Sequence, residues 1–153
     1  MVKEAHTHKR HSAMDLTACT CANLRGAARV VTQAYDAALL PSGLKATQFT
    51  LLATLAKRGS LPLTRLADAL VMDRTTLTRN LKPLVGKGFV RVDRDADHRV
   101  RRISLTDAGR AALNEAIPHW RKAQTRLVKS LGRARWSGFL DDLAETVALA
   151  QGR

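Results

Sequence analysis

Residues 63–106 read LTRLADALVMDRTTLTRNLKPLVGKGFVRVDRDADHRVRRISLT, and this stretch decides the fold. Its apolar spacing predicts a short helix over 63–70, which Pro62 opens, and a second helix over 74–85, for which Asp73 is a good N-terminal cap. The turn between the two helices is only a few residues long. This order is typical of a helix-turn-helix.

The period of the sequence then changes from helical to alternating. Residues 89–93 and 102–105 alternate between polar and apolar side chains, which predicts two strands, and the polar segment 94–99 is suited to the tip of a hairpin. Two helices followed by a two-stranded hairpin form a winged helix-turn-helix.

The rest of the chain predicts helices on both sides of this unit. We expect a mobile basic tail over 1–14 and a single domain over 15–153, mainly α-helical with a small β-hairpin. Within that domain, the winged helix-turn-helix takes 46–106, and dimerisation helices take 15–40 and 107–151, with a bend expected at Pro118.

Composition narrows the class of protein. The chain has 153 residues, of which 45% are hydrophobic and 4% aromatic, so the core must consist mainly of aliphatic side chains in packed helices. Its net charge of +13 favours a polyanionic partner. We find no membrane span, no secretory signal, no helix with its basic residues along one amphipathic face, and no hydrolase or phosphate-loop motif. A cytoplasmic protein that is not an enzyme is therefore expected.

The outward side of the second helix combines cations with short hydroxyl side chains. Such a face suits the major groove of DNA, because Arg contacts guanine and Ser or Thr reach phosphates or base edges, although a solvated helix face is the alternative. The basic hairpin tip could reach a minor groove. The predicted DNA contacts are Arg74, Thr75, Thr76, Thr78, Arg79 and Lys82 on the helix, and Arg94, His98, Arg99 and Arg101 on the hairpin.

The flanking helices carry more apolar side chains than one small domain can cover, which indicates a homodimer. The alternative is that they pack only within one chain. The predicted interface residues are Leu16, Trp120, Leu127, Leu131, Trp136, Phe139, Leu143 and Val147.

Two thiols stand out in the first helix. Cys19 and Cys21 are two positions apart, so in a helix they point to different sides and cannot pair without unwinding. A peroxide-reactive thiol, a thiophilic metal site and two incidental small residues all remain open. The tail residues His6, His8 and His11 with Met14 could bind a metal, but so basic a tail disfavours cations, and we expect no metal and no cofactor.

These motifs together resemble the MarR family of bacterial transcriptional regulators. The resemblance rests on residues 66–79, on Gly88-Phe89-Val90, on Asp97-His98-Arg99 and on residues 103–109, and it runs from about Asp15 to the C-terminus. It implies a homodimer, formed by the first, fifth and sixth helices, that binds a pseudo-palindromic operator. The wing arginine of the family corresponds to Arg99.

The resemblance also shows where this sequence departs from the family pattern, and it implies which effectors to expect. Its wing commonly reads Asp-Arg-Arg, so His98 replaces a fixed charge, and Lys45 stands where a Thr often caps the second helix. Family members bind small aromatic ligands between the DNA-reading domain and the dimer interface, and the candidate ligand contacts here are Tyr35, His119 and Arg121. Some members of the family instead sense oxidants through a cysteine.

Three functions are therefore compared. The first is a sequence-specific DNA-binding regulator, a repressor released by a small ligand or an oxidant. The second is a thiol-based redox or metal sensor that uses Cys19 and Cys21, with the winged domain as a scaffold. The third is a winged module that docks on RNA or on another protein.

Overall fold

The computed structural model describes residues 16–94 and 99–152. It divides into two compact units, 1–34 and 35–153. The first unit contains the 3₁₀ turn η1 (Leu16–Ala18) and most of helix α1 (Thr20–Leu39), whose last five residues belong to the second unit. The predicted tail and the hairpin tip around His98 lie outside the described residues.

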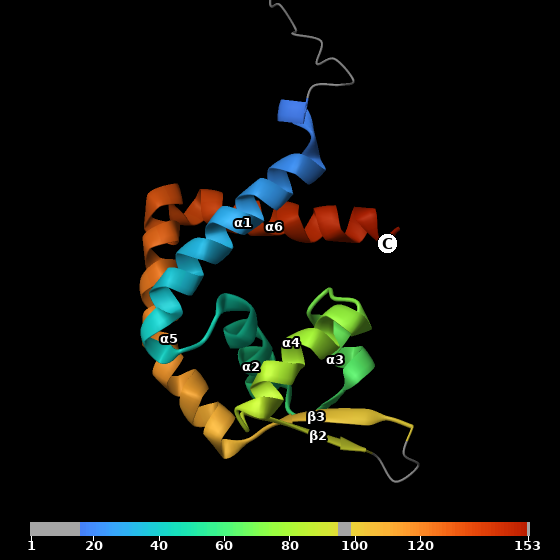
Figure 1. Cartoon of the computed structure of the whole chain (residues 1–153). Coiled ribbons are helices and arrows are strands. Elements are labelled where there is room, and N and C mark those ends of the chain that lie inside the picture. Colours follow the sequence, from blue (N-terminus) through green and yellow to red (C-terminus); the bar gives the residue numbers. More distant parts are fainter. Residues whose placement is uncertain (1–15, 95–98, 153) are drawn as a thin grey trace, which may run out of the picture. The chain divides into compact units, whose positions relative to one another are not determined.

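The second unit holds the winged helix-turn-helix and two long C-terminal helices (Figure 1). Its fold is mainly α-helical with a small antiparallel sheet, as the sequence predicts. The elements that follow α1 are η2 (Leu40–Ser42), α2 (Ala46–Arg58), β1 (Leu61–Pro62), α3 (Leu63–Ala69), α4 (Arg74–Gly86), β2 (Val90–Arg94), β3 (Arg101–Leu105), α5 (Asp107–Leu131) and α6 (Arg133–Ala150).

The sheet differs from the predicted two-stranded hairpin because a third strand joins it. The strand order is β1-β3-β2, with Leu61 opposite Ile103 and Pro62 opposite Arg102. Two residues are too few to show an alternating pattern, and proline is tolerated only at a sheet edge, so the sequence gives no strand signal here. Strand β3 is consequently paired on both sides.

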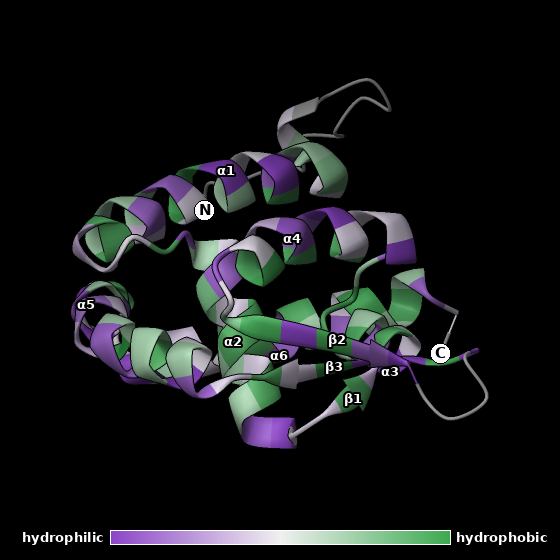
Figure 2. Ribbon diagram, turned by 60° about the horizontal axis from the view of Figure 1, so that its bottom comes forward, coloured by the Kyte–Doolittle hydropathy of each residue, from purple (hydrophilic) through white to green (hydrophobic). Residues whose placement is uncertain are grey.

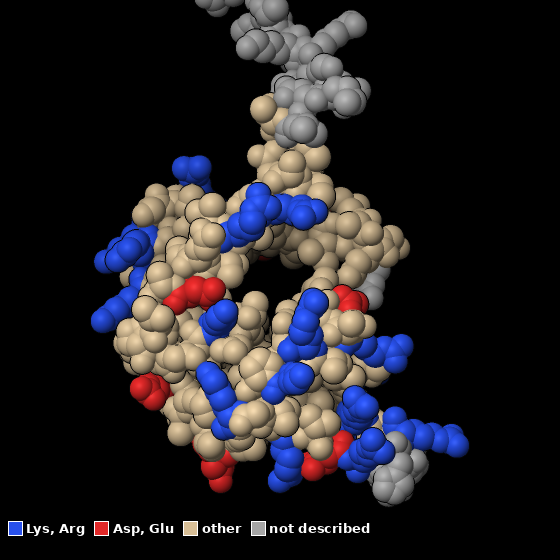
Figure 3. Space-filling view, viewed as in Figure 1, with Lys and Arg blue, Asp and Glu red and all other residues tan. Residues whose placement is uncertain are grey.

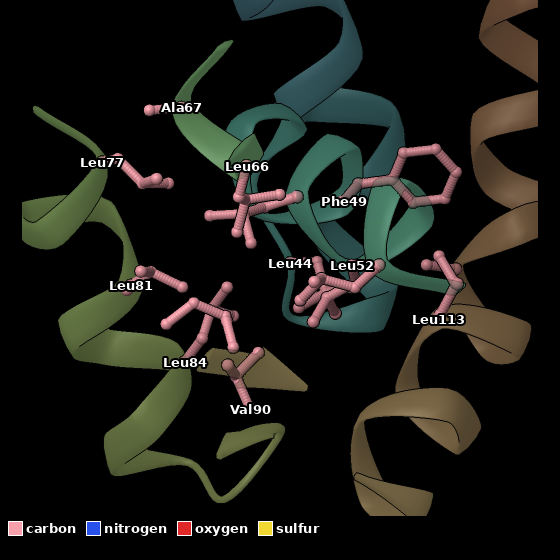
Figure 4. Close-up of a cluster of buried hydrophobic side chains, with 14 of the residues drawn as sticks. Leu44, Phe49, Leu52, Leu66, Ala67, Leu77, Leu81, Leu84, Val90 and Leu113 are labelled. Atoms are coloured by element: carbon pink, nitrogen blue, oxygen red, sulfur yellow. The ribbon is translucent and has the colours of Figure 1, made fainter. Parts of the chain in front are cut away.

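Aliphatic side chains from α2, α3, α4, the sheet and α5 form one core in the second unit (Figure 4). Figure 2 shows the hydrophobic segments of these elements turned toward one another. Trp120 was predicted to need a partner subunit, but it is half-buried and its ring stacks on Phe49 with 5.5 Å between the ring centroids. This contact within the chain was not predicted, because sequence spacing cannot place α2 beside α5, and the role of Trp120 in a dimer interface stays a prediction.

Helix ends are fixed by side chains near and far in sequence. The Thr106 hydroxyl oxygen accepts a hydrogen bond from the Gly109 N–H and so caps α5, which continues through Pro118. At the start of α2, Lys45 makes no side-chain cap. The Ala46 N–H instead donates to the carboxylate of Asp36, ten residues earlier in the chain.

Within the described part of the chain, no helix is both long enough and apolar enough to cross a lipid bilayer.

Candidate nucleic-acid interface

Helix α4 begins after Asp73, whose side chain caps the helix and binds both the N–H and the hydroxyl of Thr76. The Asp73 carboxylate accepts hydrogen bonds from the Thr76 N–H at 2.8 Å and from the Thr76 hydroxyl at 2.6 Å. These bonds hold the pKa of Asp73 below its ordinary value, the side-chain bond contributing most. Thr76 was predicted to contact DNA, but its hydroxyl is engaged in this cap. The Asp73-x-x-Thr76 spacing was a signal for that role.

The opposite side of α4 forms the polar wall of a surface hollow of about 630 Å³ between α4 and the sheet. Five predicted DNA contacts on α4 line it together, and we call them the α4 face: Arg74, Thr75, Thr78, Arg79 and Lys82. Arg101 from β3 joins them, and among residues 16–94 and 99–152 no acidic side chain lines the hollow. Its floor is apolar, made by Leu63, Leu81, Val85, Val92 and Ile103.

The base of the wing lies next to the start of α4. A second hollow, of about 320 Å³, brings Arg99 and Arg101 together with Arg74 and with Thr64 of α3. Three guanidinium groups therefore surround one depression, a concentration of positive charge that suits a phosphate group. Thr64 was not predicted from the sequence, and its position in the first turn of α3, two residues after Pro62, was the available signal.

Like charges also face each other across the hairpin. Arg94 is the ladder partner of Arg101, a pairing that destabilises an isolated sheet. Arg91 instead forms a 2.7 Å ion pair with Asp93 on its own strand. Figure 3 shows Lys and Arg side chains crowded at the lower right of the molecule, where Figure 1 places the wing. The arrangement favours a polyanion against α4 and the wing.

The predicted interface residues of the C-terminal helices differ in exposure. Phe139 and Val147 are 45% and 39% exposed, and Leu140 and Leu149, which the prediction omitted, are 43% and 69% exposed. Leu127, Leu131, Trp136 and Leu143 are half-buried, whereas Leu16 lies in η1. No side chain of α6 is buried within the single chain.

The two thiols lie at the start of α1. Cys19 directly precedes the helix and is half-buried, Cys21 is in its first turn and exposed, and both are free. The backbone carbonyl of Cys19 accepts hydrogen bonds from the backbone and side-chain amides of Asn23. Thus only Cys21 is helical, and the two residues do not share the continuous helix predicted for them.

Two of the three candidate effector contacts lie near the core of the second unit. The hydroxyl of Tyr35 donates to the side-chain carbonyl of Gln124 on α5, and burial raises the pKa of Tyr35. His119 is half-buried. Arg121 is exposed and lines a different hollow on α5, described below.

Known proteins share this architecture. Residues 44–100 match the model of the MarR family. The chain is similar to the transcriptional regulator MosR of M. tuberculosis, solved in complex with DNA, with 43% identity, a TM-score of 0.81 and coverage of 88% of this chain and 97% of MosR. It is also similar to the transcriptional repressor CouR bound to a 23-mer DNA duplex, with 26% identity, a TM-score of 0.77 and coverage of 89% and 97%. CouR has also been solved bound to p-coumaroyl-CoA.

Curated sequences match over a smaller share of their length. The transcriptional regulator PecS of Dickeya dadantii is 32% identical over 92 residues, which are 58% of this chain. The chain spans 63% and 55% of the two curated relatives that it matches. Because the likeness to MosR covers nearly all of that protein, the chain belongs to the MarR family of transcriptional regulators.

Proposed function

We propose that the protein is a cytoplasmic, homodimeric regulator that binds a pseudo-palindromic operator in duplex DNA and represses transcription. The observation that carries this proposal is the hollow between α4 and the sheet, which cations from both elements line and which none of the described acidic residues enters. MosR and CouR, solved on DNA, support the same partner for this chain.

In this proposal α4 lies in the major groove. Arg74 and Arg79 are long enough to reach guanine edges or phosphates, and each well-formed bidentate contact discriminates by about 1–3 kcal/mol between bases. The Thr78 hydroxyl donates to the carbonyl of Arg74 at 2.7 Å, which leaves its oxygen lone pairs for a donor on a base. The wing arginines Arg99 and Arg101 would then approach the flanking minor groove.

The exposed apolar side of α6 supports the homodimer. Phe139, Leu140 and Val147 recur at helical spacing on one side of a helix that has no buried side chain in the single chain. A two-fold partner would cover them and would place two copies of α4 about 34 Å apart, one turn of duplex.

Release by an effector is the remaining part of the proposal. A small ligand is supported by CouR, a 26% identical protein solved with p-coumaroyl-CoA. An oxidant is the alternative, and the exposure of the Cys21 thiol is the observation in its favour. Loss of operator binding on adding hydroperoxide, and its persistence in C19S/C21S, would assign the oxidant, whereas equal loss in both proteins would exclude these thiols.

Selection of duplexes from a random pool, followed by titration of the selected site at several salt concentrations, tests the proposal. We expect one enriched palindromic sequence. We also expect R99A to weaken binding by at least about 1 kcal/mol and to lower the salt slope by about one. A monomer in sedimentation, or a pool without enrichment, would overturn the proposal and would leave docking on RNA or protein as the function to test.

A further inference from the structure

Helix α5 repeats the residue pattern of the α4 face. On α4, Arg, Thr, Thr, Arg and Lys occupy positions i, i+1, i+4, i+5 and i+8, starting at Arg74. On α5, Arg, Lys, Thr, Arg and Lys occupy the same positions, starting at Arg121. These positions lie on one side of a helix. We call the second set the α5 face: Arg121, Lys122, Thr125, Arg126 and Lys129.

The five residues of the α5 face are all exposed, and with Pro118 they line a surface hollow of about 620 Å³. Its described lining contains no acidic side chain. Among the residues that the structure describes, none of the four cations forms an ion pair. The face therefore carries four uncompensated positive charges around one depression.

Such a face destabilises its own helix, because Lys122 and Arg126 are four positions apart and Arg126 and Lys129 three. A bound polyanion would remove this repulsion. On the apolar side of α5, Leu113 and Ala116 are buried in the core, and Leu127 and Leu131 further along the helix are half-buried. The prediction that no helix carries its cations along one amphipathic face is therefore wrong. A membrane-surface helix is nonetheless disfavoured, because that binding mode needs a free apolar side.

The α5 face lies apart from the α4 face. In Figure 3, one group of Lys and Arg side chains projects from the left edge, where Figure 1 places α5, and another gathers at the lower right beside the wing. In this view the two groups of cations project from opposite sides of the second unit.

We propose that the α5 face binds the phosphate backbone of a second DNA duplex, so that one protein molecule bridges two double helices. The cations run from position i to i+8, about 12 Å along the helix axis, which spans adjacent phosphates of one strand. Thr125, at the centre of the face, adds a hydroxyl that can donate to a phosphate oxygen. The contact would be independent of base sequence.

A two-duplex capture assay tests this bridging. One mixed-sequence duplex is immobilised and saturated with the full-length protein, and retention of a second, fluorescent duplex is then measured over a range of salt concentrations. We expect R126Q/K129Q to retain at least about five-fold less of the second duplex and to lower the salt slope of its capture by about two, since two phosphate contacts are lost. The control K57Q/R58Q, which removes the same charge from the last turn of α2, should capture as the wild type does.

Binding of the protein to the immobilised duplex is a separate readout. It should persist in R126Q/K129Q and be lost in R74Q/R79Q, so failure of the proposed function is distinguishable from failure of bridging. Equal second-duplex capture by R126Q/K129Q and K57Q/R58Q would overturn the inference. A change in sedimentation of DNA-free R126Q/K129Q would also overturn it, because the face would then join copies of this chain.

Discussion

Replacing Gly109 with alanine tests how tightly the wing is joined to α5. Gly109 is buried in the first turn of α5, and a Cβ built there would lie 2.0 Å from the carbonyl oxygen of Phe89 and 2.8 Å from a methyl carbon of Leu105. The first contact is with backbone, so no side-chain rotation relieves it. Helix α5 must move away from the strand that follows Phe89.

That movement also breaks the hydrogen bonds of Thr106. Its N–H donates to the carbonyl of Phe89 at 3.1 Å, and its hydroxyl donates to the carbonyl of Gly88 at 2.6 Å. The two bonds contribute about 1 kcal/mol each, and overpacking costs about 1–3 kcal/mol. Alanine regains about 1 kcal/mol of helix propensity, so we expect G109A to lower the free energy of unfolding by about 2–4 kcal/mol.

Gly138 provides the matched control. It lies within α6, and a Cβ there would meet nothing within 4 Å. G138A should therefore raise the free energy of unfolding by about 0.5–1 kcal/mol. Urea unfolding followed by circular dichroism, at one fixed protein concentration, measures both variants. A G109A protein as stable as the wild type would refute the argument.

Three further predictions concern single side chains. Val71 is 59% exposed and adopts a φ of +53°, a left-handed conformation that asparagine tolerates better than valine. V71N should therefore raise the free energy of unfolding by about 1 kcal/mol, and a lower urea midpoint would count against strain at this turn. The folded pKa of Asp73 is below its ordinary 3.8, so the stability that its carboxylate contributes is complete above pH 3.8 and is lost as the pH falls through the folded pKa. D73N should therefore flatten the fall in the free energy of unfolding at acid pH, and an unchanged pH profile would argue against the cap. Tyr35 is the only tyrosine, and burial raises its pKa above 10.0, so the absorbance of tyrosinate should titrate with a midpoint above 10.0. The contribution of Tyr35 to stability is present below pH 10.0 and is lost as the pH rises through its folded pKa. A titration midpoint at or below 10.0 would contradict the burial of this side chain.

Local signals in the sequence predict the helices and the α4 face well. Helices α1, α2, α4 and α5 end at or close to a glycine or proline, although α4 and α5 continue through Pro83 and Pro118, and α4 starts directly after Asp73 as its cap predicts. The exposed cations of α4 follow from helical spacing alone, because the apolar positions leave only one side free. Whether these residues contact DNA is beyond what spacing can establish.

Contacts between segments far apart in the chain were not predicted. The stacking of Trp120 on Phe49 and the capping of α2 by Asp36 both depend on how helices pack, which short-range periodicity does not encode. Strand β1 was missed because two residues carry no period. The cations of the α5 face recur at helical spacing in the sequence, a pattern that the prediction of no basic amphipathic face missed.

The small sheet has two unpaired edges, and each resists the addition of a foreign strand. On one side β1 is only two residues long and contains Pro62, which has no N–H to donate. On the other side β2 exposes Arg91, Asp93 and Arg94 along its edge. Charged and proline-containing edges discourage edge-to-edge aggregation. These edges therefore disfavour pairing between the sheets of neighbouring molecules at high protein concentration.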